Sequence, residues 1–146
     1  MAQSDSRRLS MVLPYLYPDL RNDASSTADY HLRNDMDGTG TFLVWENNEI
    51  PEPTDQELAD AKEDATNAYW WKRLREKRDR LLVDSDWSQG ADVPDDLKAS
   101  YVTYRNDLRN LPTTVTKPDF ETLNNESNNE SVDNRWNMKN YMPTKP

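Results

Sequence analysis

The chain has 146 residues, a formal net charge of −9 and a hydrophobic content of only 34%. A chain this polar buries only a small core, and we expect much of it to lie in arms and loops. The negative charge argues against a general nucleic-acid binder, because the affinity of such proteins rests on cationic contacts to phosphate.

Residues 1–28 are predicted to form an N-terminal arm. The stretch 1–10 is polar, and we expect it to be flexible. The apolar stretch that follows contains Pro14 and Pro18, and two prolines four residues apart disfavour a helix interior, so we predict an extended conformation. The arm lies either on the chain's own core or in a groove on a partner, where aromatic side chains are typical anchors. The candidate partner-binding residues are Leu13, Tyr15, Leu16 and Tyr17.

Residues 29–50 are predicted to form a β-hairpin. Tyr30 and Leu32, and then Phe42 and Val44, alternate with other residues, and the turn residues 34–40 lie between these two runs. A two-stranded hairpin is marginal by itself, so one face needs a cover, and Trp45 is a candidate contact. When Gly38 is aligned with the invariant glycine of a calcium loop, Arg33 falls at the first ligand position and Val44 falls where a bidentate glutamate belongs, so we predict no metal site there.

Residues 54–112 are predicted to form an antiparallel helical hairpin. Thr54 and Glu57 form a capping box, so the first helix begins there, and we expect it to end near Leu82. Its acidic residues come early and its basic residues late, which complements the helix dipole. Docking of the late arginines on an acidic partner surface is the alternative interpretation of this gradient.

The second helix of this hairpin carries the clearest periodicity in the chain. Its apolar residues are spaced four, three, four and three apart, which places them on one helical face, and we expect Pro94 to start the helix and Pro112 to stop it. We expect Trp87, in the connecting loop, to plug the open end of the hairpin. The predicted hairpin core is Trp70, Trp71, Leu74, Leu81, Leu82, Trp87, Leu97, Tyr101, Tyr104, Leu108 and Leu111.

Residues 113–146 are predicted to form an extended C-terminal arm. The Asn/Glu/Ser-rich stretch 121–134 is typical of a flexible spacer. Aromatic and methionine side chains then return in a polar context, and this tail either binds a partner or packs back on the chain. The candidate partner-binding residues here are Trp136, Met138, Tyr141 and Met142.

The residues required by the common kinds of enzyme site are missing from the sequence. There is no cysteine and only one histidine, His31, which excludes typical zinc sites and histidine-activated nucleophiles. No phosphate-binding glycine loop occurs. We therefore predict no catalytic, metal or cofactor site, no enzymatic activity and no small-molecule substrate. No apolar run approaches the roughly 20 residues of a membrane span, and no signal-peptide pattern opens the chain, so we expect no membrane partner.

The region 69–112 resembles the tail assembly chaperone family of tailed bacteriophages and the small tail-fibre-associated proteins that share this module. The ordered series that carries the resemblance is Arg78, Arg80, Leu81, Leu82, Asp86, Trp87, Asp92, Pro94, Tyr101, Tyr104, Arg105, Leu108, Arg109, Leu111 and Pro112. The family commonly has tryptophan where this chain has Tyr101, and the closing residues 142–146 are similar to its proline-rich ending.

We therefore expect a mainly α fold with a small β-hairpin, of the α+β class, and extended N- and C-terminal arms. The resemblance implies a non-enzymatic phage tail protein that binds tail or tail-fibre subunits in several copies, without nucleic acid. It would act as a virion structural or adaptor component or as a tail assembly chaperone, located in the virion tail after assembly in the host cytoplasm. The alternative is an acidic regulatory or inhibitor protein that masks a basic surface of a host or phage enzyme.

Overall fold

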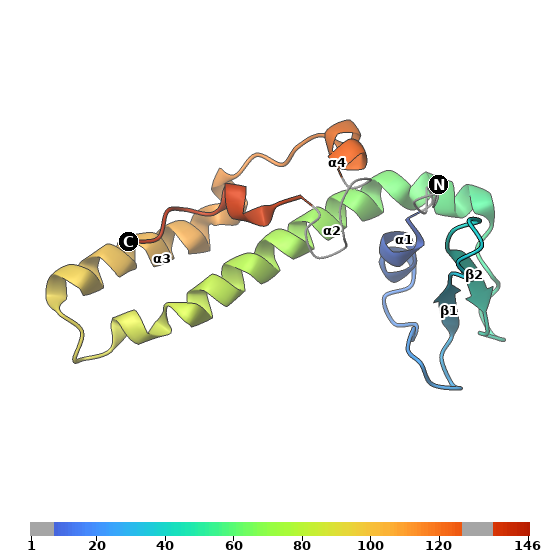
Figure 1. Cartoon of the computed structure of the whole chain (residues 1–146), viewed down its shortest axis with the longest axis horizontal. Coiled ribbons are helices and arrows are strands. Elements are labelled where there is room, and N and C mark those ends of the chain that lie inside the picture. The colour runs from blue at the N-terminus through green and yellow to red at the C-terminus, as the bar shows by residue number, and fades with distance from the viewer. Residues whose placement is uncertain (1–7, 127–135) are drawn as a thin grey trace. The chain divides into compact units, whose positions relative to one another are not determined.

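The computed structural model describes residues 8–126 and 136–146, and its elements are drawn in Figure 1. The chain divides into two compact units, residues 1–69 and 70–146, and the boundary falls inside one long helix. The elements are α1 (Leu9–Leu16), β1 (Tyr30–Arg33), β2 (Phe42–Trp45), α2 (Asp55–Asp84), the 3-10 turn η1 (Asp86–Gln89), α3 (Asp95–Thr114), α4 (Phe120–Glu126) and the 3-10 turn η2 (Met138–Tyr141). The mainly α fold with a small antiparallel β-hairpin is confirmed.

The first unit is built around α1, which replaces the extended arm expected from the prolines. Leu9, Val12 and Leu13 are fully buried, and their spacing places them on one helical face. Pro14 cannot donate a hydrogen bond to the carbonyl of Ser10, but both residues are exposed, so water can bind that carbonyl. Three buried side chains contribute about 1.5–3 kcal/mol each, which outweighs the roughly 3 kcal/mol cost of an interior proline.

The β-hairpin packs on the same core in a register that the sequence left ambiguous. Tyr30 pairs with Trp45 and Leu32 with Leu43, so these side chains share one face of the ribbon. Phe42 and Val44 lie on the opposite face of the ribbon from Tyr30 and Leu32. The run 42–45 consists of four consecutive apolar residues, and its periodicity cannot select a face. The completed core is Leu9, Val12, Leu13, Tyr30, Leu58, Ala61 and Ala65.

Helix α2 begins with the predicted capping box and continues two residues beyond its expected end. The backbone N–H of Thr54 donates to the Glu57 carboxylate at 2.7 Å, and the Glu57 N–H donates to the Thr54 hydroxyl at 3.2 Å. The helix then runs to Asp84 rather than Leu82. Its last turn contains no basic residue, so the basic stretch does not complement the dipole at the C-terminus, where the effect is confined to the last turn.

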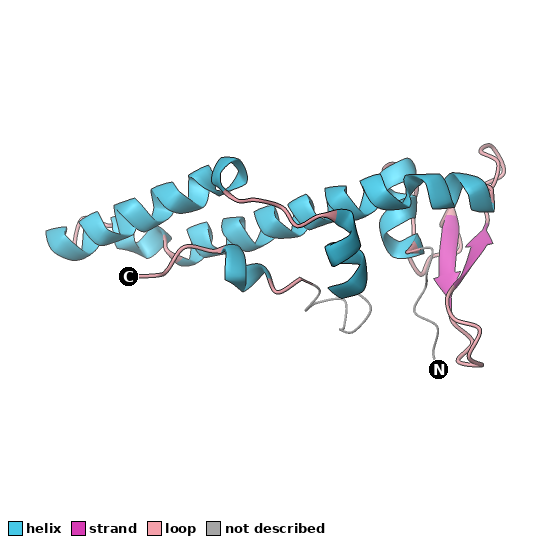
Figure 2. Ribbon diagram, turned by 90° about the horizontal axis from the view of Figure 1, so that it is seen from above, coloured by secondary structure: helices cyan, strands magenta, loops and turns pink. Residues whose placement is uncertain are grey.

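In the second unit, α3 lies alongside the second half of α2 and runs in the opposite direction (Figures 1 and 2), as the helical hairpin requires. Pro112 does not stop α3, which ends at Thr114. The turn past the proline is held by the Val115 N–H, which donates to the Leu111 carbonyl at 3.0 Å, and by the Thr113 hydroxyl, which donates to the Asn110 carbonyl at 2.8 Å.

The C-terminal segment contains two short helical elements rather than a fully extended arm. Asp119 caps α4, since its carboxylate accepts from the Thr122 N–H at 2.8 Å, and Leu123 is fully buried. The tail after residue 135 packs on its own unit: Trp136 is 4% exposed and Met138 8% exposed. The stretch 127–134 of the expected spacer lies outside the described residues, as does the stretch 1–7 of the expected flexible start.

Candidate functional site

The end of α2 is joined to α3 by the buried side chain of Arg105, which is 8% exposed. One guanidinium nitrogen donates to the Leu82 carbonyl at 2.6 Å and to the Ser85 hydroxyl at 2.7 Å, and the other donates to the Asp86 carboxylate at 2.7 Å. The cation thus binds a carbonyl in the last turn of α2, where the helix dipole is negative. Arg105 supplies from α3 the positive charge that the last turn of α2 lacks.

Two buried serines extend this contact into η1. The Ser85 hydroxyl donates to the Leu81 carbonyl at 2.8 Å, and the Ser88 hydroxyl donates to the Ser85 carbonyl at 2.6 Å. Ser85 is 2% exposed and Ser88 is fully buried, and their hydroxyls add a second hydrogen bond to carbonyls that already accept from the backbone N–H groups of the same two serines. We call Leu82, Ser85, Asp86, Ser88 and Arg105 the Arg105 cluster.

Beside the Arg105 cluster, the helices share an apolar core. Tyr101, Tyr104 and Leu108 are buried against Leu81 and Leu82. Burial raises the pKa of Tyr104, and the neighbouring Tyr101 and the carboxylate of Asp84 act in the same direction. Tyr101 and Tyr104 are therefore packing residues of the hairpin.

Most of the residues predicted for the hairpin core are buried or partly buried, with two departures. Trp70 and Leu74 are fully buried, Leu111 is 6% exposed, and Trp71, Leu81 and Leu82 are partly buried. Leu97 is 39% exposed and Trp87 is 53% exposed, so neither closes a core. Trp87 does contact Tyr101 edge-on, with ring centroids 5.0 Å apart, but its own ring remains largely open to solvent.

The residues predicted to bind a partner differ widely in accessibility. In the first unit, Leu13 is fully buried, Leu16 and Tyr17 pack against the core, and Tyr15 is 45% exposed. In the second unit, the indole N–H of Trp136 donates to the Leu123 carbonyl at 3.0 Å, and Tyr141 lies edge-on to Trp70 at 5.2 Å. Met142 packs against the core of tyrosines. Their partner-binding role stays a prediction, and Leu13, Trp136 and Met138 are covered by the chain itself.

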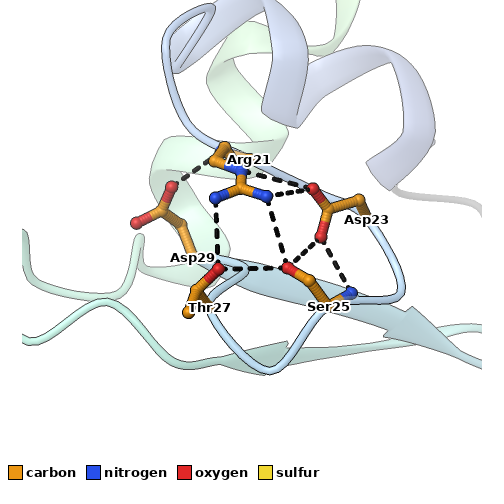
Figure 3. A network of polar contacts seen from close by, with 5 residues as sticks. All are labelled: Arg21, Asp23, Ser25, Thr27 and Asp29. Carbon is orange, nitrogen blue, oxygen red and sulfur yellow. Dashed lines mark hydrogen bonds and ion pairs between the residues drawn. The ribbon is translucent and has the colours of Figure 1, made fainter.

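A polar network fixes the loop before β1 (Figure 3). The guanidinium of Arg21 donates to the Asp23 carboxylate at 2.7 Å and to the Thr27 hydroxyl at 3.1 Å. The Ser25 hydroxyl and backbone N–H also donate to Asp23, and these bonds, with the Arg21 contact, lower the pKa of that carboxyl to about 2. Asp29 accepts from the Arg21 backbone N–H at 2.7 Å, which joins the loop to the strand. Asp29 also accepts from the side-chain amide of Asn47 at 2.7 Å, so the network ties the loop to the segment that follows β2.

Neither unit presents a cluster of metal-ligating side chains in the part of the chain that the structure describes. Within residues 8–126 and 136–146, no group of three or more His, Cys, Asp or Glu side chains could hold a metal ion. His31 lies on β1 and is partly buried, opposite Val44. None of the described helices combines the length and apolarity needed to cross a membrane.

The Arg105 cluster was not singled out from the sequence as a site. Arg105 lies four residues after Tyr101 and three before Leu108, so helical spacing places it on the buried stripe. A cation on an apolar stripe indicates a buried acceptor, and the end of the preceding helix offers one. That signal was present in the sequence, whereas the roles of Ser85 and Ser88 depend on the turn geometry of η1.

Two family models match the chain, one in each unit. Residues 71–128 match the phage tail assembly chaperone protein family, and residues 9–69 match the XkdW protein family. No curated protein and no solved structure matches the chain. The chaperone match spans the paired helices, the Arg105 cluster and α4. Each unit is thus similar to a phage family, and the two matches together support a tailed-phage tail assembly family, with the chaperone match located in the second unit.

Proposed function

We propose that the chain is a non-enzymatic assembly protein that binds tail or tail-fibre subunits and acts in the host cytoplasm while the tail is built. The observation that carries this proposal is the coincidence of the chaperone match, residues 71–128, with the helical hairpin. The Arg105 cluster fixes the two helices and the turn between them, so the hairpin offers a partner a preformed surface.

The binding surface of the folded chain differs from the two aromatic arms expected from the sequence. Leu13, Trp136 and Met138 already contribute to the two units, and a partner would reach them only after local unfolding. Tyr15, Trp87 and Leu97 are open to solvent in the folded chain. We therefore assign the main contact with tail subunits to the hairpin and a second contact to Tyr15.

The proposal is tested by co-expressing the tagged chain with the tail genes of the phage that encodes it. We expect tail or tail-fibre subunits to co-purify with the tagged chain, and mass spectrometry to identify them. A parallel analysis of purified particles separates the two forms of the role: a chaperone is absent from particles, and a structural or adaptor component is present in several copies. Capture of a soluble enzyme with no tail subunit would contradict the proposal and support the acidic regulator.

A further inference from the structure

The turn between α2 and α3 exposes a tryptophan on a rigid base. Trp87 is 53% exposed, whereas its neighbour Ser88 is fully buried and Ser85 is 2% exposed. The Trp87 carbonyl accepts from the Gly90 N–H at 3.2 Å, and Arg105 holds the adjacent Asp86. An aromatic side chain whose backbone is already ordered loses little conformational freedom on binding, and tryptophan is enriched among the dominant residues of interfaces.

A second apolar side chain lies on the same side of α3. Leu97 is 39% exposed and precedes Tyr101 by four residues, which places the two on one helical face. The Tyr101 ring is the one that Trp87 contacts edge-on. Trp87 contacts Tyr101, Leu97 lies on the helical face of Tyr101, and both side chains remain largely exposed apolar surface. We call residues 84–97 the hairpin tip.

The hairpin tip is strongly acidic. Residues 84–97 contain no lysine or arginine. They contain five aspartates, all of them exposed: Asp84, Asp86, Asp92, Asp95 and Asp96. Asp86 is engaged by Arg105, and Asp95 and Asp96 occupy the first turn of α3, where the dipole favours acids. Folding does not explain Asp84, because it is the last residue of α2, where the dipole disfavours a carboxylate.

The charge of the hairpin tip indicates which kind of partner binds this surface. Three of the cations in the second half of α2 already have acidic or aromatic neighbours: Arg73 and Glu76 lie 3.1 Å apart, Arg78 and Asp79 lie 2.7 Å apart, and Arg75 lies over Trp71. Two copies of a chain with a net charge of −9 also repel each other. A second copy is therefore disfavoured, and a basic foreign surface is favoured.

We propose that the hairpin tip docks a segment of a tail protein in which lysine or arginine side chains flank an apolar residue. The apolar residue packs on Trp87 and Leu97, and the cations pair with the aspartates of the tip, Asp84 and Asp92 above all. This inference rests on the proposed function and adds to it the surface and the chemistry of the partner.

The test uses overlapping synthetic peptides that span the tail proteins encoded with this chain, titrated against the full-length protein. The bound peptides are expected to be basic with an apolar residue, and their affinity is expected to fall as salt is raised. Trp87→Ala is expected to lower the affinity at least tenfold, as for an interface hot spot. Leu97→Ser provides a second apolar variant, at a residue that is already largely exposed. The triple variant D84N/D92N/D96N is expected to weaken binding and to reduce its salt dependence.

Matched controls separate the tip from general effects. Val83→Ala changes an apolar side chain that is 68% exposed and lies just before the tip, and it is expected to leave the affinity unchanged. D60N/E63Q/D64N neutralises three exposed acids on the first half of α2 and controls for net charge. Melting curves monitored by circular dichroism verify that each variant is folded.

Each outcome decides the proposal. If the wild-type chain binds tail subunits and the tip variants bind equally well, the proposal is overturned and the proposed function stands. If the wild-type chain captures no tail subunit, the proposed function fails and the proposal fails with it. If sedimentation shows a dimer that Trp87→Ala dissociates, the occupant is a second copy and the proposal is overturned.

Discussion

Replacing Arg105 by methionine tests whether this side chain joins the two helices of the hairpin. Methionine keeps the unbranched apolar stem but removes the guanidinium and its bonds to the Leu82 carbonyl, the Ser85 hydroxyl and Asp86. The Asp86 side chain is 64% exposed, so its ion pair contributes little and the other two bonds dominate.

The expected loss follows from those two bonds. A hydrogen bond from a charged donor contributes about 1.5–3 kcal/mol. Both acceptors retain another contact, because the Ser85 hydroxyl also reaches the Leu82 carbonyl, at 3.1 Å. We therefore expect Arg105→Met to lower the free energy of unfolding of the second unit by about 2–4 kcal/mol. Arg105→Lys should recover only part of this loss, since an ammonium cannot reproduce the planar fork of donors.

The assay is urea unfolding monitored by circular dichroism, with Arg109→Met as the matched control. Arg109 lies one turn further along α3, is exposed, and donates to Asn106 at 3.2 Å. Its loss is expected to change the free energy of unfolding by no more than about 0.5 kcal/mol. Equal effects of the two substitutions would refute the reasoning, because the buried arginine would then contribute no more than a surface one.

Three further substitutions test other parts of the structure. Pro14→Ala adds an N–H that can donate to the Ser10 carbonyl and should raise the free energy of unfolding of the first unit by about 1–3 kcal/mol in thermal melts; an unchanged or lower value would indicate an extended segment. Ser25→Ala removes a hydroxyl donor from the Asp23 carboxylate, so the pKa of that carboxyl should rise from about 2 toward its ordinary value in an NMR titration. Because the folded pKa of Asp23 lies below the unfolded one, its stabilising contribution is complete above about pH 4 and is lost as the pH falls through about 2; a contribution that grew on acidification would contradict this assignment. Trp136→Phe removes the bond to the Leu123 carbonyl and should cost about 1 kcal/mol in urea unfolding, whereas a tail that is free of its own unit would show no change.

The parts of the fold that follow from local signals were predictable from the sequence. Thr54 and Glu57 specify the start of α2 by a reciprocal pair of bonds, and Tyr101, Tyr104 and Leu108 specify the inner face of α3 by their spacing. Each of these signals lies within a few residues of the element that it specifies, so one sequence suffices to recognise it.

The predictions that failed relied on local preferences of the chain, which contacts between residues far apart in the sequence outweigh. Pro14 disfavours a helix, but Leu9, Val12 and Leu13 are buried against residues of β1 and α2 that lie far away in the chain. Similarly, nothing near Trp136 predicts that its indole reaches the Leu123 carbonyl. The face of β2 depends on pairing with β1, because a run of four apolar residues has no intrinsic inward side.

The conflict between local preference and structure is most informative at the hairpin tip. The last turn of α2 contains an acid and no base, which is the opposite of what the helix dipole favours. Arg105 compensates from α3, but it does so by binding the Leu82 carbonyl and Asp86 and makes no bond to Asp84 in the structure. A sequence under selection for stability alone would place lysine or arginine at position 84 and a polar residue at position 87. Asp84 and Trp87 both oppose those preferences within one turn of chain, which is expected if the tip is the binding surface proposed above.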